Sequence, residues 1–325
     1  MTASGTAASP GLDEALEEVL SAVSPTEDGT GVRLGDREVR AERPRQLRQR
    51  LGTALYETFH AGHAFGDKPG ILHRDMVLEA QLAEAVPHST TPVAARPVDD
   101  RPPGSGPVVS LGGVRVRLPA GTLPAEPGPG GDGRVPLRLP TARPRLSPGF
   151  FLVDGSRGTC GPGPLLRVYV HLAEPSSAVE VWRTVLDLLE EHGVPYRAKI
   201  TSSRRLLPRR DGLVVYLGPG AWHTVPGLAR AVPATAVGHS VSAFARALAP
   251  GVAVAWEPDD KRPGRRNSSF GQHRSLAIAE GIEASLREGD LSRLHAHVLT
   301  ALNESGINPS TLFRNSSSPD LPFLC

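Results

Sequence analysis

The chain has 325 residues, which is enough for one large domain or two of ordinary size. Its 36 basic and 34 acidic residues almost balance, so bulk charge points to neither a nucleic acid nor a membrane as a partner. The two cysteines make no disulfide framework, and no stretch approaches the roughly eighteen apolar residues of a membrane span, so we expect a soluble, cytoplasmic protein.

The N-terminal part of the chain is predicted to be mainly helical. Residues 1–10 are small and polar and should be disordered, and residues 11–86 form the predicted N-terminal helical region. Apolar residues at helical spacing predict helices over 12–23, 44–60 and 75–84, with a hairpin over 31–39.

Proline, glycine and arginine dominate residues 87–148, which predicts an irregular connection that contains β-structure. Short strand-like runs occur within it at 108–110, 114–118 and 135–139. Residues 149–315 form the predicted catalytic domain, and residues 316–325 are a tail without periodicity.

Two alternating strands with a helix between them organise the predicted catalytic domain. The strands span 165–172 and 196–201, and each has one apolar face. The helix, over 177–192, should begin with a capping box made by Ser177 and Glu180. Together they form a predicted β-α-β unit.

The other faces of these two strands carry polar side chains. They are Arg167, Tyr169 and His171 on the first strand, and Arg197 and Lys199 on the second. A basic loop over 202–210 follows, and then a strand over 213–217 that contains Tyr216. This concentration of guanidinium, phenol, imidazole and amine groups predicts a site for an anion.

Lys199 is a candidate general base. A base needs a pKa near the working pH, and both burial and neighbouring cations lower the pKa of a lysine. The alternative is a solvated lysine on a strand. His171 is a candidate general acid, and its alternative is a histidine with its partners satisfied at the edge of the core.

Arginine forks match the oxygens of a phosphate monoester, so the loop arginines are candidate phosphate contacts, although a solvated basic loop would have the same composition. Further elements are predicted downstream: helices over 221–232, 240–248, 276–288 and 291–304, and a strand over 252–256. Arg274 lies near the start of one of these helices, where an anion is favoured.

With these residues in place, the chain resembles the HopA-type effector family, as it occurs in actinobacterial peptide-modification clusters. The resemblance rests on four stretches: Leu55-Tyr-Glu-Thr-Phe-His-Ala-Gly62, the polar strands around Arg167 and Lys199, the arginine-rich loop up to Tyr216, and Ser269-Phe-Gly-Gln-His-Arg274. These features span most of residues 50–290.

Family members in thioamitide and class V lanthipeptide clusters work beside an aminoglycoside-phosphotransferase-like kinase. The kinase phosphorylates Ser or Thr of a precursor peptide, and its partner is assigned to elimination. The chain is also similar to the phosphothreonine lyases secreted by enteric pathogens. In those enzymes a lysine is the base, a histidine is the acid, and a basic residue two positions before that histidine helps to hold phosphate.

Carried over to this chain, the resemblance implies Lys199 as the base and Arg210 and Tyr216 as phosphate contacts. Arg167 takes the basic position, so Tyr169 stands where the histidine would. His171 lies two residues further along the same face, and the acid is therefore Tyr169 or His171. The remaining expected phosphate contacts are Arg204, Arg205 and Arg274.

We therefore expect an α/β (α+β) fold with a central mixed sheet flanked by helices, a phosphothreonine-lyase-like core and an N-terminal helical part.

The expected activity is that of a carbon-oxygen lyase, which eliminates phosphate from phosphoserine or phosphothreonine to give dehydroalanine or dehydrobutyrine without a metal or organic cofactor. The expected partners are a phosphorylated precursor peptide and the kinase, with no nucleic acid and no membrane. The alternative is a non-catalytic, effector-like module that binds the precursor peptide or the kinase.

Overall fold

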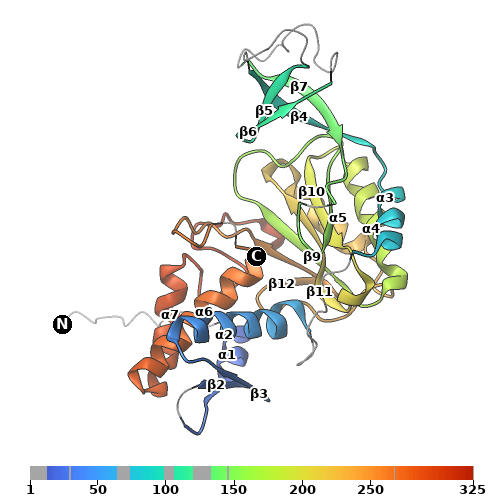
Figure 1. The fold of residues 1–325 in the computed structure, drawn as a ribbon. Coiled ribbons are helices and arrows are strands. Elements are labelled where there is room, and N and C mark those ends of the chain that lie inside the picture. The colour runs from blue at the N-terminus through green and yellow to red at the C-terminus, as the bar shows by residue number, and fades with distance from the viewer. Residues whose placement is uncertain are drawn as a thin grey trace, which may run out of the picture.

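The computed structural model describes residues 13–28, 31–63, 74–98, 106–119, 133–144, 146–266 and 268–324. The expected disorder of residues 1–10 lies outside these ranges. A six-stranded sheet forms the centre of the molecule (Figure 1). In spatial order its strands are β12 (Arg246–Ala249), β13 (Val252–Trp256), β9 (Leu166–Leu172), β11 (Arg209–Leu217), β10 (Tyr196–Thr201) and β8 (Phe150–Asp154).

The α/β class predicted from the sequence is confirmed, but the central sheet, as far as the structure describes it, is antiparallel and not mixed as predicted. Within the described residues, every pair of neighbouring strands in the large sheet is antiparallel. The strands β9 and β10 run in the same direction but do not touch, because β11 lies between them. The predicted β-α-β unit is therefore a crossover that leaves room for one intervening strand.

One face of the large sheet is apolar and is covered by helices. These helices are α3 (Met76–Glu84), α4 (Pro175–Glu191) and α5 (Val225–Ala231) (Figure 1). Trp182 of α4 is fully buried, packs edge-on against Phe151 and donates a hydrogen bond from Nε1 to Leu82 O of α3. Burying such side chains contributes about 1.5–3 kcal/mol each, so this layer fixes the orientation of the sheet.

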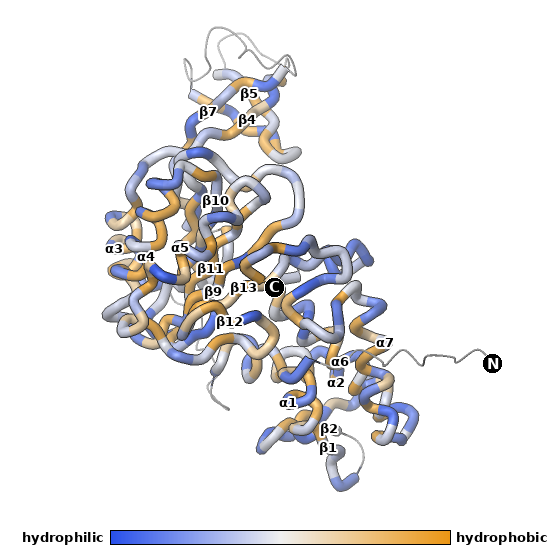
Figure 2. Tube along the Cα trace, turned by 180° about the vertical axis from the view of Figure 1, so that it is seen from behind, coloured by the Kyte–Doolittle hydropathy of each residue, from blue (hydrophilic) through white to orange (hydrophobic). Residues whose placement is uncertain are grey.

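A second helical layer lies beside the other face of the sheet. It contains α1 (Glu14–Ser21), α2 (Pro44–Leu55), α6 (Phe270–Glu288) and α7 (Leu294–Glu304) (Figure 1). A small sheet of β1 (Val23–Pro25), β2 (Gly31–Leu34) and β3 (Arg37–Arg40) adjoins α1 and α2. These N-terminal elements share one hydrophobic core with the large sheet, and Figure 2 shows the apolar residues concentrated along the central strands.

A four-stranded sheet projects beyond one end of the large sheet (Figure 1). Its strands, in spatial order, are β6 (Val114–Arg117), β5 (Val108–Leu111), β4 (Thr90–Val98) and β7 (Val135–Pro140). They enclose a separate small cluster of buried residues around Ala95, Val109 and Leu137. The strand-like runs predicted within 87–148 are therefore strands.

Three helix predictions differ from the structure in detail. Helix α4 begins at Pro175, and Ser177 Oγ donates to Ala236 O, so the predicted capping box does not form. The helix predicted over 240–248 is wrong, because residues 240–245 are not helical and residues 246–248 belong to strand β12, which pairs with β13. The helix predicted from 276 begins at Phe270, where Ser269 and Gln272 make a capping box.

Among the described residues, no helix combines the length and the apolar character that crossing a bilayer would require.

Candidate active site

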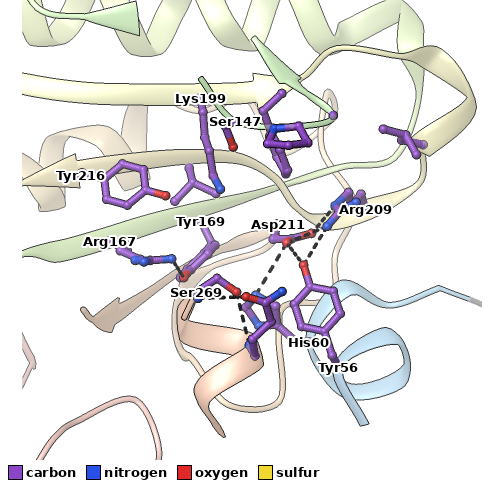
Figure 3. Close-up of a pocket in the computed structure, with 16 residues that line it drawn as sticks. Tyr56, His60, Ser147, Arg167, Tyr169, Lys199, Arg209, Asp211, Tyr216 and Ser269 are labelled. Atoms are coloured by element: carbon purple, nitrogen blue, oxygen red, sulfur yellow. Dashed lines mark hydrogen bonds and ion pairs between the residues drawn. The ribbon is translucent and has the colours of Figure 1, made fainter. Parts of the chain in front are cut away.

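A cavity of about 810 Å³ lies against the polar face of the large sheet (Figure 3). Its floor comes from two adjacent rows of cross-strand neighbours. Tyr169, Val214 and Lys199 form one row, and Arg167 and Tyr216 begin the next. Side chains directly opposite each other on antiparallel strands project from the same face, so strand pairing alone brings these groups together.

The roof of the cavity comes from the second helical layer. Helix α2 ends in a π-helical turn, Tyr56–Ala61, which places Tyr56 and His60 over the sheet. Ser269 and Gln272 at the N-terminus of α6 form another part of the wall (Figure 3). A helix N-terminus favours negative charge, and π-helical turns occur frequently at functional sites.

An irregularity in β11 supplies two more lining residues. The four steps along β11 from Arg209 to Leu213 pair with only two steps along β9, from Leu172 to Val170. Strict alternation from Tyr216 would bring residue 210 to the cavity side, but Arg209 and Asp211 line the cavity instead. β-Bulges commonly re-aim side chains in this way next to active sites.

Asp211 is the centre of a buried polar cluster at one side of the cavity. It accepts hydrogen bonds from Tyr56 Oη at 2.9 Å and from Arg209 Nε at 2.5 Å. Although burial alone would raise the pKa of Asp211, Arg209 and the other partners hold it well below its usual range. The carboxylate is therefore ionised and its charge is compensated by Arg209.

His60 faces the same cluster. Its Nε2 lies 3.7 Å from Asp211 Oδ2, and its Nδ1 lies 2.8 Å from Ser242 Oγ. Burial lowers the pKa of His60 to about 4, even though Asp211 acts in the opposite direction. His60 is therefore a neutral imidazole at neutral pH.

Lys199 stands apart from these pairs. Its Nζ lies 4.2 Å from the centre of the Phe150 ring and 6.0 Å from that of Tyr216. Among the described residues, its amine contacts aromatic faces rather than a carboxylate. An amine placed in this way is available to a ligand in the cavity.

Arg167 is a buried cation held from several sides. It pairs through Nε with Glu257, its Nη1 lies 3.4 Å from Tyr169 Oη, and its guanidinium lies 4.9 Å from the centre of the Tyr216 ring. Burial would lower the pKa of Arg167, but Tyr169, Tyr216 and Glu257 more than compensate and raise it. Burial also raises the pKa of Tyr169, which is therefore a neutral phenol.

The cavity is electrostatically suited to an anion. Among its described lining residues, Arg167, Lys199 and Arg209 are cationic and Asp211 is anionic, so the formal charge is +2. A phosphate monoester carries a charge of about −2 at neutral pH and accepts several hydrogen bonds. Within the described residues, no group of three or more His, Cys, Asp or Glu side chains is arranged to hold a metal ion.

Four of the residues singled out in the sequence line this cavity together. They are Lys199, Tyr169, Arg167 and Tyr216. His171 lies outside it, although it is on the same strand face as Tyr169. Its Nδ1 contacts Ser240 O at 2.8 Å, and its ring covers Gly238.

The other expected phosphate contacts also lie outside the cavity. Arg204 pairs with Asp75 and Gln81 of the α3 segment, and Arg205 is exposed. Arg210 packs on Gly62 and donates to Thr58 O and Ser240 Oγ.

Arg274 is fully buried within the fold. It donates to the carbonyl oxygens of Leu312 and Arg314 and to Asn315 Oδ1, so its guanidinium holds the C-terminal segment. Arg274 thus lies outside the cavity, whereas its position near a helix start had suggested a phosphate contact.

Sequence reasoning did not assign Tyr56, His60 or Asp211 to the site, and it included Arg209 only as one of the loop arginines. Tyr56 and His60 belong to one of the stretches that carry the family resemblance, which was the available signal for them. Arg209 and Asp211 lie within and next to the basic loop, but the bulge conceals which of its residues face the cavity.

The fold and the cavity define a class: a mixed α/β protein with a cation-lined pocket between an antiparallel sheet and a helical layer. A family model, the HopA1 effector protein family, matches residues 141–314, and the chain belongs to this family. This confirms the resemblance to HopA-type effectors. The search of curated proteins found no match.

Two solved structures of effector proteins are similar to this chain. The effector protein from Pseudomonas syringae pv. syringae strain 61 has 14% identity and a TM-score of 0.39, over 51% of this chain and 62% of that one. The effector protein from Pseudomonas syringae pv. tomato strain DC3000 has 12% identity and a TM-score of 0.47, over 85% of this chain and 91% of that one.

Proposed function

We propose that this protein is a phospholyase that eliminates phosphate from phosphoserine or phosphothreonine in a peptide, leaving dehydroalanine or dehydrobutyrine. The observation that carries the proposal is the position of Lys199. Its amine shares one cavity with the guanidinium groups of Arg167 and Arg209, and its described contacts are aromatic rings. Such an arrangement combines a base with a phosphate clamp.

In the proposed reaction the amine of Lys199, once it has given up its own proton, removes the α-proton of the phosphorylated residue. The electron pair forms the Cα=Cβ bond, the Cβ–O bond breaks, and phosphate leaves. The cations around the cavity stabilise the charge that gathers on the departing oxygens, which is commonly the largest contribution to such catalysis. Water does not attack, and this separates the reaction from phosphate ester hydrolysis.

Arg209 and Arg167 are the proposed phosphate clamp. The contacts of Arg209 with Asp211 and Tyr56 use Nε and Nη2, and those of Arg167 use Nε and Nη1. Each guanidinium therefore has one terminal nitrogen without a described protein partner. Charge-assisted hydrogen bonds from these groups are stronger than those between neutral groups.

Tyr169 is the proposed acid for the leaving oxygen. It is a protonated phenol on the cavity floor, two residues from Arg167 on the same strand and in the same cross-strand row as Lys199. The leaving phosphate oxygen would lie between the clamp and the phenol. His171 is not used in this mechanism because it lies outside the cavity.

The proposed substrate is a precursor peptide, and the proposed supplier of the phosphate is the aminoglycoside-phosphotransferase-like kinase implied by the family resemblance. The rival function is a non-catalytic module that docks phosphorylated peptide or kinase. Lys199 distinguishes the two functions because docking requires only its charge, whereas elimination requires it to lose and gain a proton.

The test compares the parent protein with Lys199→Arg on matched serine and phosphoserine peptides. Arginine keeps the charge but stays protonated, so elimination should fall by about 10² to 10⁴ while phosphopeptide binding persists. Mass spectrometry separates the outcomes: elimination yields a product one water lighter than the serine peptide, and hydrolysis yields the serine peptide itself. Arg183→Lys, at an exposed position on α4, is the control. Turnover by Lys199→Arg within a few-fold of the parent would remove Lys199 as the base.

A further inference from the structure

Two further cavities continue from the candidate active site along the sheet. The first measures about 820 Å³ and shares Ser147, Arg167, Lys199 and Tyr216 with the site, so the two are parts of one depression. The next measures about 1070 Å³ and shares Leu146, Thr159 and Arg197 with the first. The three cavities together form what we call the extended groove.

The direction of the extended groove follows from strand pairing. On β8 the lining residues run from Phe150 at the active site through Leu152 to Asp154 in the far cavity, which at the rise of a β-strand is about 13 Å. The far cavity is then walled by β4 and β7 of the projecting sheet, with Val93 and Pro136 among its lining residues. The length of the extended groove and its course along the strand therefore suit an extended peptide.

The far cavity is strongly positive. Its described lining contains Arg134, Arg143, Arg157 and Arg197 against the single carboxylate of Asp154, a formal charge of +3. Asp154 is only 2% exposed and already pairs with Arg197 at 2.7 Å, so it does not present negative charge to a ligand. Arg157 and Arg134, by contrast, are exposed.

The kind of ligand follows from the neighbouring side chains. None of the described residues that line the far cavity is aromatic, so bases of a single-stranded nucleic acid would find no stacking platform. Leu146, which lines both added cavities, is a large apolar residue with 61% of its surface exposed. Arginines beside an exposed leucine suit a peptide with carboxylates and an occasional apolar side chain.

We propose that the extended groove binds an acidic segment of the substrate peptide on one side of the phosphorylated residue, and that this segment selects the substrate. The inference rests on the proposed function for the position of the phosphorylated residue. It goes beyond that function because it predicts a sequence preference at peptide positions several residues away from the phosphorylated residue.

The test measures binding of three fluorescent phosphoserine peptides by anisotropy: one with acidic residues before the phosphoserine, one with them after it, and one with neutral flanks. Binding is measured with Lys199→Arg, so that turnover does not consume the probe. One of the two acidic peptides should bind about tenfold more tightly than the neutral one, and the advantage should shrink at about 0.5 M NaCl.

The variant Arg134→Glu/Arg157→Glu should remove this advantage and leave the affinity for the neutral peptide within about twofold. The matched control is Arg183→Glu/Arg230→Glu, which reverses two exposed charges on α4 and α5 and should change neither affinity. Equal gains in affinity from acidic residues on both sides, or equal losses of affinity in both double variants, would indicate long-range electrostatic attraction. Either result would overturn the proposal that the groove binds the acidic segment.

The outcomes separate the groove from the chemistry. An acidic preference that depends on Arg134 and Arg157, in a protein that eliminates phosphate from no peptide, would refute the phospholyase and leave the groove in place. Elimination from a minimal phosphoserine peptide, with no preference for either acidic flank, would refute the groove alone.

Discussion

Gly271 of α6 lies directly against the imidazole of His60. A Cβ atom at position 271 would be 2.1 Å from His60 Cδ2 and 2.4 Å from Cγ, so no other residue fits there without moving the ring. This contact joins the start of α6 to the π-helical turn that carries Tyr56 and His60. A side chain at position 271 would therefore move His60, one of the residues that line the cavity.

Gly271→Ala should therefore displace His60 and disturb the cavity. Ala has the better helix propensity, but overpacking typically costs about 1–3 kcal/mol, and here His60 is buried on every side. We expect a lower midpoint in urea denaturation and a lower rate of elimination. Gly220→Ala is the control, because a Cβ there meets no atom within 4 Å. A Gly271→Ala protein as stable and active as the parent would contradict this packing argument.

Stability should depend on pH through His60. Burial lowers its pKa from the ordinary 6.5 to about 4, so between these values the unfolded chain binds a proton that the folded protein does not. The free energy of unfolding should therefore fall as the pH drops from about 6.5 to about 4, by on the order of 3 kcal/mol from this residue. His273, whose pKa burial also lowers to about 4, acts in the same direction.

The measurement is urea denaturation at several pH values for the parent and for His60→Gln. The variant should be less stable at neutral pH but should show a shallower loss of stability towards low pH, because one of the histidines whose pKa is lowered by burial is gone. An identical pH dependence in the two proteins would show that His60 does not titrate in this window.

Arg274→Met should destabilise the protein without a direct effect on phosphate binding. The change leaves Leu312 O without its Arg274 donor and leaves Arg314 O with only the backbone N–H of Asn308, and losing several buried hydrogen bonds to a charged group costs about 2–5 kcal/mol. Arg287→Met, at an exposed position on the same helix, should cost less than about 0.5 kcal/mol. If the folded fraction of Arg274→Met lost phosphopeptide affinity, Arg274 would contribute to the site after all.

Arg209→Lys should weaken phosphopeptide binding by about tenfold, because lysine keeps the charge beside Asp211 but loses the fork that donates to two partners at once. Arg210→Lys is the matched comparison one residue away, and its effect should be within about twofold, since Arg210 packs on Gly62 outside the cavity. Isothermal titration with a phosphoserine peptide measures both. A larger loss from Arg210→Lys would reverse the assignment of the two arginines.

Much of the cavity floor could be predicted from local pattern. Alternation identified the faces of β9 and β10, and side chains on one face converge wherever their strands share a sheet. Arg167, Tyr169 and Lys199 could therefore be grouped before their distances were known. The insertion of β11 between the two strands could not be predicted in this way, because strand order depends on long-range pairing.

The roof of the cavity was beyond local pattern for a different reason. Tyr56 and His60 reach the sheet because α2 packs against α6, and the helices meet only in the folded chain. Arg274 shows the opposite error: a basic residue at a helix start suggested an anion, whereas its partners are carbonyl oxygens of the C-terminal segment. Composition identifies a charge but not what compensates it.

The bulge in β11 has a consequence for comparing this chain with its relatives. Arg209 and Asp211 share the cavity with Tyr216, yet each is separated from it by an odd number of positions, whereas residues on one face of a regular strand are separated by even numbers. A relative whose strand lacks the bulge would need its clamp arginine at an even spacing from the tyrosine. A sequence alignment that matched the arginines of the two chains would then pair a residue inside the pocket with one outside it. Equivalent residues in this family should therefore be identified both by residue type and by whether their separation from the tyrosine is odd or even.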